Sequence, residues 1–197
     1  SCEFYVRLGK RLSSDERMLR MRVGIVAESF LPNINGVTNS VLRVLEHLKR
    51  EGHEAIVVAP GARDFQEEVP DYLGFEIVRV PTVMIPLIDS LPIGVPTTTV
   101  AAALADFKPD VIHLASPFVL GGAGAFAARQ LDIPAVGLYQ TDVAGFATKY
   151  HAAMVANIAW DWTRTIHNMC QMTLAPSSAT ISELESRGIK NVNHWGR

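Results

Sequence analysis

Short apolar runs alternate with amphipathic stretches along most of the chain. Seven runs have the length and the Val, Ile, Leu and Ala content of strands buried on both faces of a sheet: residues 22–27, 54–59, 75–80, 110–115, 134–139, 172–175 and 191–195. Helices are predicted between them over residues 37–51, 97–107, 121–131, 152–168 and 177–187. This alternation predicts an α/β fold with a doubly wound, Rossmann-like, mainly parallel sheet of about seven strands.

The first predicted helix shows the pattern in most detail. Its apolar residues fall on one buried stripe: Val37, Val41, Val44, Leu45 and Leu48. Gly52 ends the helix, because glycine accepts the left-handed conformation found just past helix ends. The strands on either side of this helix form a βαβ unit, so we expect them to pair in parallel through a right-handed crossover.

Composition and charge narrow the class of protein. The 197 residues are 48% hydrophobic and 19% charged, which is ordinary for one folded domain and argues against disorder. The 18 Lys and Arg against 20 Asp and Glu give a net charge of −2, so we expect no nucleic-acid partner. Cys2 and Cys170 lie too far apart for a disulfide framework or a zinc motif, which fits a reducing cytoplasm, and we expect no metal site.

The amino-terminal residues differ from the rest of the chain. Residues 1–20 carry charges throughout and have no strand pattern, so they read as an extension, frayed or weakly helical, and not as a signal peptide. No apolar run approaches the roughly 20 residues of a membrane span. We therefore expect one domain over residues 21–197, located in the cytoplasm.

In doubly wound sheets, ligands bind at the carboxyl ends of the strands, which selects the loops 28–36, 116–124 and 140–150. Gly36 opens a helix directly after the first strand. A phosphate can approach the helix N-terminus there without meeting a Cβ, although such a glycine also serves to relieve a tight turn. Gly121, Gly122 and Gly124 open a later helix, where close packing on the sheet is favoured over a second phosphate cradle.

Polar residues at two further strand ends are candidates for contact with a substrate. His113 lies in a buried strand, where a hydrogen-bonded core histidine is the favoured interpretation, and Ser116 and Pro117 lie at the tip of that strand. The next strand ends in a polar cluster able to hold sugar hydroxyl groups, or else in a turn capped by an aspartate. This cluster and its rim contain Tyr139, Gln140, Thr141, Asp142 and Tyr150.

The segment 79–98 is apolar and contains four prolines, so it cannot form a regular helix. It is interpreted either as a loop packed over the sheet edge or as an apolar rim for a lipid-linked acceptor. The second interpretation implies peripheral contact with the inner face of the plasma membrane.

Several of these segments together resemble a known family. The run from Met21 to Ser40, with Ala-Glu-Ser-Phe-Leu-Pro before Asn35 and Gly36, resembles the opening of retaining glycosyltransferases of family 4, which have the GT-B architecture. The segments 109–117, 139–147 and 174–177 are most similar to the actinobacterial GDP-mannose-dependent α-mannosyltransferases of this family. The likeness extends from residue 21 to residue 197.

The resemblance implies two Rossmann-like domains that bind different substrates. The first binds the acceptor, a lipid or glycan, and the second binds the nucleotide sugar, here GDP-mannose, with no obligatory metal or other cofactor. Gly36, with Asn35 beside it, then lies against the donor diphosphate. His113, Ser116, Pro117 and the residues of the polar cluster named above inherit a role in binding sugar or acceptor.

The chain also departs from the family pattern. Many relatives have a histidine where this chain has Ala115, and another where it has Gln140, so no catalytic residue is assigned. The donor domain is expected to follow residue 197, and the chain by itself is expected to be inactive.

Two other functions compete with this interpretation. A non-catalytic α/β module that binds a ligand or a partner protein would show the same alternation of strands and helices. A nucleotide-dependent oxidoreductase is disfavoured, because the loop after the first strand lacks the G-x-G-x-x-G fingerprint. The P-loop lysine and the hydrolase motifs are missing as well.

Overall fold

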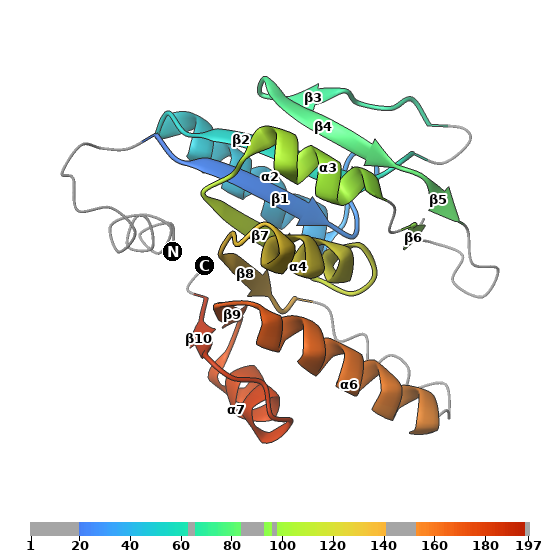
Figure 1. The fold of residues 1–197 in the computed structure, drawn as a ribbon, viewed down its shortest axis with the longest axis vertical. Helices are drawn as coiled ribbons and strands as arrows, with labels where there is room; N and C mark the ends of the chain where they lie inside the picture. Colours follow the sequence, from blue (N-terminus) through green and yellow to red (C-terminus); the bar gives the residue numbers. More distant parts are fainter. Residues whose placement is uncertain (1–19, 63–65, 84–92, 96–97, 141–152, 196–197) are drawn as a thin grey trace.

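The computed structural model describes residues 20–62, 66–83, 93–95, 98–140 and 153–195. Its main sheet has eight strands in the order β10-β9-β8-β7-β1-β2-β4-β3, of which all but β3 run parallel (Figure 1). The parallel strands are β1 (Arg22–Ala27), β2 (Glu54–Pro60), β4 (Phe75–Val80), β7 (Val111–Ala115), β8 (Ala135–Leu138), β9 (Met172–Ala175) and β10 (Val192–His194). The predicted α/β fold and its seven parallel strands are therefore confirmed.

The eighth strand was not predicted. β3 (Asp71–Tyr72) is two residues long and pairs antiparallel with β4 at the edge of the sheet. Two further short strands, β5 (Thr82–Val83) and β6 (Ile93–Gly94), form a separate antiparallel pair within the proline-rich segment. Residues 84–92 of that segment lie outside the described residues, and so does the predicted extension, apart from Arg20.

Five helices connect the strands of the main sheet in the described part of the chain. They are α2 (Gly36–Arg50), α3 (Thr98–Phe107), α4 (Leu120–Gln130), α6 (Ala153–Met169) and α7 (Ser178–Ser186). Figure 1 shows α2 behind the sheet and α3, α4 and α6 in front of it. Crossovers between parallel strands are right-handed, so the face on which a helix lies depends on the direction in which the chain moves along the sheet. The chain moves one way from β1 to β2, and the opposite way from β4 to β7 and on to β10.

Two apolar cores follow from this layering. Val41, Val44, Leu45 and Leu48 of α2 pack on one face of the sheet, as the predicted stripe required. On the other face, Leu104 of α3 and the small residues of α4 pack against Val26, Ile112 and Leu114. α2 ends at Arg50, and Gly52 has a φ of 75°, so its predicted role at the end of this helix is confirmed.

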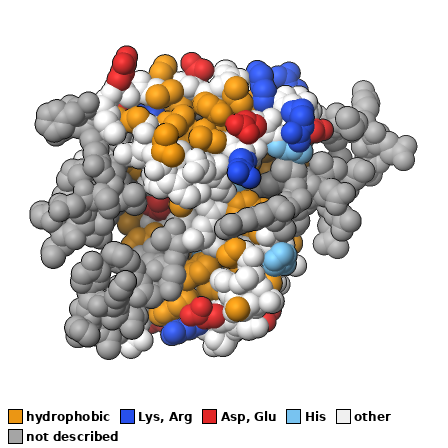
Figure 2. Space-filling model, turned by 180° about the vertical axis from the view of Figure 1, so that it is seen from behind, with side chains coloured by type: hydrophobic (Ala, Val, Ile, Leu, Met, Phe, Trp, Pro, Cys, Tyr) orange, Lys and Arg blue, Asp and Glu red, His pale blue; other side chains and the backbone are white. Residues whose placement is uncertain are grey.

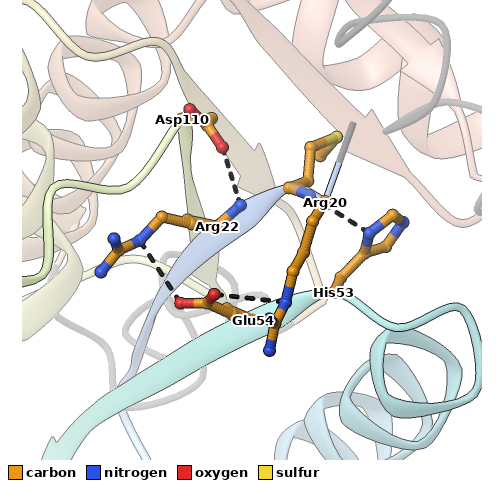
Figure 3. Close-up of polar contacts among 6 residues, drawn as sticks. Arg20, Arg22, His53, Glu54 and Asp110 are labelled. Atoms are coloured by element: carbon orange, nitrogen blue, oxygen red, sulfur yellow. Dashed lines mark hydrogen bonds and ion pairs between the residues drawn. The ribbon is translucent and has the colours of Figure 1, made fainter. Parts of the chain in front are cut away.

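A cluster of polar contacts joins the strands at their amino-terminal ends (Figure 3). The N–H of Arg22 donates to Asp110 Oδ2 at 2.7 Å, and the N–H of Met21 donates to His53 Nδ1 at 3.3 Å. The carboxylate of Glu54 lies between Arg20 Nε at 3.2 Å and Arg22 Nε at 3.6 Å. These contacts fix the start of β1 between its two neighbours, at the edge opposite to the one where ligands bind in such sheets.

Hydrophobic side chains remain at the surface in places. Figure 2 shows them gathered in the upper part of the rear face, with Lys and Arg side chains beside them. Over the whole described surface, the exposed large hydrophobic residues are Ile34, Leu73, Phe126 and Ile158. Within the described residues, no helix has the length and the apolar content needed to cross a membrane.

Candidate functional site

The strand order creates a switch point between β1 and β7. The chain leaves β1 toward β2, and it later returns to the other side of β1 as β7. The last residues of the two strands are direct neighbours, because Ala27 pairs with Ala115. The loops that follow, 28–35 and 116–119, therefore begin side by side at the edge where ligands bind in doubly wound sheets.

The first of these loops leads into α2 through an asparagine cap. Asn35 Oδ1 accepts a hydrogen bond from the N–H of Thr38 at 3.0 Å, and Asn35 Nδ2 donates to Ser29 Oγ at 2.8 Å. Thr38 Oγ1 donates to the carbonyl of Asn33 at 2.8 Å. The side chain of Asn35 thus caps the N-terminus of α2. Its contact with a diphosphate stays a prediction.

Gly36, the first residue of α2, leaves this N-terminus open. It is exposed, and a Cβ built on it would meet no atom within 4 Å. The N–H groups of Gly36 and Val37 have no hydrogen-bond acceptor within the described part of the chain. Because the helix dipole adds positive potential at these N–H groups, the tip of α2 can receive an anion.

The N-terminus of α4, by contrast, is filled by a carboxylate of the chain itself. Glu28 follows β1 directly, and its Oε1 accepts hydrogen bonds from the N–H groups of Phe118 at 2.7 Å and Gly121 at 2.8 Å. Its Oε2 accepts a third from the N–H of Leu120 at 3.2 Å. Burial raises the pKa of Glu28 above its usual value, although the hydrogen bonds from the backbone act in the opposite direction.

The glycines of α4 serve close packing. A Cβ on Gly122 would lie 2.7 Å from Trp162 Cζ2, and one on Gly124 would lie 2.8 Å from Leu114 Cδ2. A Cβ on Gly121 would overlap the Cβ of Pro117. Gly124 thus packs on the sheet, Gly122 on α6 and Gly121 on the preceding turn, and these distances favour close packing over a second phosphate cradle.

His113 lies inside the sheet. Its side chain has 0% exposure, and its neighbours in register on β1 and β8 are Ile25 and Val136. Burial lowers its pKa to about 4, so the imidazole is neutral at pH 7. The structure thus favours the core histidine of the two interpretations, and the role of His113 in binding a sugar stays a prediction.

Ser116 and Pro117 form the turn that follows β7. Ser116 has a φ of 58°, which is uncommon for a residue other than glycine, and its N–H donates to the carbonyl of Leu138 at 3.0 Å. Both residues are buried, Ser116 at 7% exposure. The turn thus borders the switch point, as the sequence predicts, while contact of either residue with a substrate stays a prediction.

Tyr139 and Gln140, at the end of β8, take different positions. Tyr139 is buried and its ring stacks on Trp160 with the ring centroids 6.4 Å apart, so its side chain belongs to the core between β8 and α6. Gln140 Nε2 donates to Ser40 Oγ at 2.8 Å, which connects the end of β8 to α2. Gln140 Oε1 is buried without a donor among the described residues, and its contact with a sugar stays a prediction.

The remaining predicted residues, Thr141, Asp142 and Tyr150, lie outside the described part of the chain. In the part that is described, no group of three or more His, Cys, Asp and Glu side chains is placed to hold a metal ion. The described candidate site therefore consists of the tip of α2, the 116–119 turn and Gln140.

Sequence reasoning missed Glu28 and Ser40, whose side chains hold the 116–119 turn and Gln140 of this site. Glu28 could have been found from its position, because it is a charged residue directly after a strand that is buried on both faces. Ser40 gave no such signal, because its contact with Gln140 joins residues 100 positions apart.

Known proteins resemble this chain in sequence. A family model described as Glycosyltransferase Family 4 matches residues 34–195. A GDP-mannose-dependent alpha-mannosyltransferase of Corynebacterium glutamicum is 70% identical over 177 residues, which cover 90% of this chain and 43% of that protein. A protein of the same name from Mycobacterium tuberculosis is 51% identical over 183 residues, covering 91% of this chain and 48% of that protein. The chain thus spans less than half the length of these curated relatives.

Solved structures share the fold at low sequence identity. Sucrose-phosphate synthase from Thermosynechococcus elongatus superimposes with a TM-score of 0.59 at 14% identity, over 89% of this chain and 47% of that structure. The Anabaena protein HepE, in complex with UDP, gives a TM-score of 0.59 at 12% identity, over 88% of this chain and 43% of that structure. These two likenesses concern the fold alone.

Proposed function

The chain belongs to glycosyltransferase family 4, and from this premise we propose that it forms one wall of the active site of an enzyme that transfers a mannosyl unit from GDP-mannose to a lipid or glycan acceptor. The name of the 70% identical relative supports the choice of donor. In this proposal the chain carries the acceptor side of the cleft, and a second domain binds the nucleotide.

The open tip of α2 is the observation that carries the proposal. Gly36 leaves free space there, and the N–H groups of Gly36 and Val37 have no acceptor in the described part of the chain. A diphosphate is a doubly charged anion that fits such a helix N-terminus. The neighbouring helix tip, that of α4, is already filled by Glu28, so α2 provides the anion site at the switch point.

Catalysis then rests on positioning and on charge. Negative charge builds on the diphosphate as its bond to the anomeric carbon breaks, and the N–H groups and dipole of α2 stabilise that charge. The sugar passes through an oxocarbenium-like state, and the acceptor hydroxyl attacks from the face that the diphosphate leaves, so that the configuration is retained. The departing phosphate oxygen takes the proton of the acceptor, while the 116–119 turn and Gln140 orient the two sugars.

The donor is tested by product analysis. We expect the complete protein that contains this chain to form a mannosylated product from GDP-mannose, and little product from GDP-glucose, UDP-glucose or UDP-galactose. Mass spectrometry of lipid and glycan acceptors after incubation measures this. Transfer from a uridine nucleotide sugar in preference to GDP-mannose would contradict the proposed donor, and the absence of transfer from every donor would favour a non-catalytic binding module.

If acceptor and nucleotide sugar are bound by two different domains, this chain alone should have little transfer activity. We expect the purified 197-residue chain to show at least a hundredfold lower transfer than the complete protein, because the groups that grip the nucleotide lie on the second domain. Radiolabelled mannose incorporation at equal molar concentrations measures this. Tight GDP-mannose binding or undiminished turnover by the chain alone would contradict this assignment of the two substrates to two domains.

A further inference from the structure

We infer that Glu28 is a positioning residue of the transfer reaction: its carboxylate fixes the 116–119 turn, which follows β7 at the switch point and would line the proposed active site. This inference rests on the proposed function for the reaction, and on the contacts of Glu28 for the mechanism. In the inferred role, Glu28 acts through the turn and contacts neither the donor nor the acceptor.

The geometry shows how Glu28 holds the turn. Its carboxylate reaches from the end of β1 to residues 90 to 93 positions later in the chain, and Oε1 alone accepts from both Phe118 and Gly121. One side chain thereby connects the two loops that start at the switch point. A carboxylate bonded to several N–H groups at a helix N-terminus is a strong, charge-assisted arrangement.

The peptide groups on either side of Phe118 are held by separate elements. The N–H of Phe118 donates to Glu28 on the β1 side, and its carbonyl accepts a 2.7 Å hydrogen bond from Trp162 Nε1 of α6. Two residues earlier, the N–H of Ser116 donates to the carbonyl of Leu138 on β8. The turn is therefore held at three points, and Glu28 is the only charged side chain among the three.

The backbone of the turn needs this support. Ser116 is held at a φ of 58°, a conformation that residues with a Cβ adopt only when their surroundings impose it. A shift of a few tenths of an ångström in the turn would move the wall of the cleft against the transferred sugar, while the tip of α2 would stay in place. A loss of Glu28 should therefore lower the rate of transfer more than the affinity for the donor.

Replacing Glu28 by glutamine tests the inference with little change of shape. An amide oxygen can still accept from Phe118 and Gly121, but the NH₂ group then faces the N–H of Leu120, and the negative charge is lost. For Glu28→Gln in the complete enzyme we expect kcat to fall at least tenfold, with the KM for GDP-mannose within twofold of the wild-type value. Steady-state kinetics well below the melting temperature of both proteins measure this.

Chemical rescue provides a second readout. In Glu28→Ala the three N–H donors lose their acceptor and a space of carboxylate size remains. Added acetate or formate should restore part of kcat in this variant, and sodium chloride at equal ionic strength should not. If Glu28→Ala does not fold, the glutamine variant still decides the matter.

Glu68 offers a matched control. Its Oε1 also accepts a hydrogen bond from a backbone N–H, that of Ala62 at 3.1 Å, but it lies exposed beyond β2. Glu68→Gln and Glu68→Ala should keep kcat within twofold of the wild-type value and show no response to acetate.

Each result of the glutamine variant decides the inference. An unchanged kcat, with or without a lower melting temperature, would overturn it, and so would a rise in donor KM at constant kcat. The proposed diphosphate site is tested separately through Gly36. Glu28→Gln can impair kcat even if substitution of Gly36 proves harmless, so failure of the one does not imply failure of the other.

Discussion

An enzyme carrying Gly36→Asp is expected to keep its fold and to lose about three orders of magnitude in kcat/KM for its nucleotide-sugar donor. Space for the new side chain is present, because a Cβ on Gly36 meets no atom within 4 Å. An acidic residue in the first turn of a helix is also favourable, by about 0.3–1 kcal/mol. The melting temperature should therefore stay equal or rise slightly.

The loss of activity follows from charge. Two like charges about 4 Å apart near a protein surface repel by about 4 kcal/mol, which corresponds to roughly a thousandfold in rate. Gly36→Ala adds only a methyl group at the tip of α2, so we expect a smaller loss, of roughly ten- to a hundredfold. Initial rates at varied GDP-mannose concentration, with differential scanning calorimetry of the same samples, measure both effects.

Ser178→Asp is the control for this substitution. Ser178 is exposed and is the first residue of α7, so the same side chain enters the same position of another helix. It should leave kcat/KM within twofold of the wild-type value. If Gly36→Asp behaved like Ser178→Asp, the diphosphate would not lie at the tip of α2, and the proposed site would be wrong.

Acidification from pH 7 to pH 4 is expected to destabilise the domain by several kcal/mol through two buried histidines. Burial lowers the pKa of His113 and of His167 from 6.5 to about 4. In the unfolded state, these two histidines therefore bind protons at a higher pH than they do in the folded state. The stabilising contribution is fully present above pH 6.5 and is lost as the pH falls toward 4, by about 3 kcal/mol for each histidine.

Glu28 acts in the opposite direction over part of this range. Its folded pKa is raised, so its contribution to stability is largest at low pH and declines as the pH rises through the folded value. Among the described residues, Glu28 is the one carboxyl group whose pKa is raised, and we expect the two histidines to dominate between pH 6.5 and pH 5.

Urea unfolding at half-unit steps between pH 7.5 and pH 4.5 measures the free energy of unfolding. His167→Gln should flatten this dependence by about half, whereas Thr163→Val, a nearby buried substitution without a titrating group, should shift stability equally at every pH. A free energy of unfolding that stays constant between pH 7 and pH 5 would contradict the assignment.

Local patterns in the sequence were sufficient for the seven parallel strands and the five described helices, but not for the two-residue strands β3, β5 and β6. The strand predicted over residues 172–175 matches β9, and the ends of the other parallel strands agree within one or two residues. Two serines, Ser177 and Ser178, stand at the predicted start of α7, and the structure makes Ser177 the cap, whose Oγ accepts from the N–H of Thr180 at 3.2 Å. Such features depend on residues within one or two turns of one another, so that propensity and apolar period reveal them.

The candidate site was only partly predictable. The glycine that opens α2 could be predicted as a site residue from the sequence, because a missing Cβ at the start of a helix lets an anion approach its N–H groups. The contact of Gln140 with Ser40 and that of Glu28 with Gly121 join residues 100 and 93 positions apart, and no local period signals them. Tyr139 looked like part of a polar cluster, yet the structure places its ring in the core against Trp160.

The sequence by itself determined the alternation of seven strands with helices, the buried stripe of α2, and the glycine at the tip of that helix, since each depends on the order of neighbouring side chains. Only the tertiary structure decided that β7 returns beside β1, which of the two helix tips at that junction stays open, and which polar residues face it. The physical reason is that parallel pairing and long-range hydrogen bonds bring together residues far apart in the chain. Their distances are set by the packing of the whole sheet and not by any one segment.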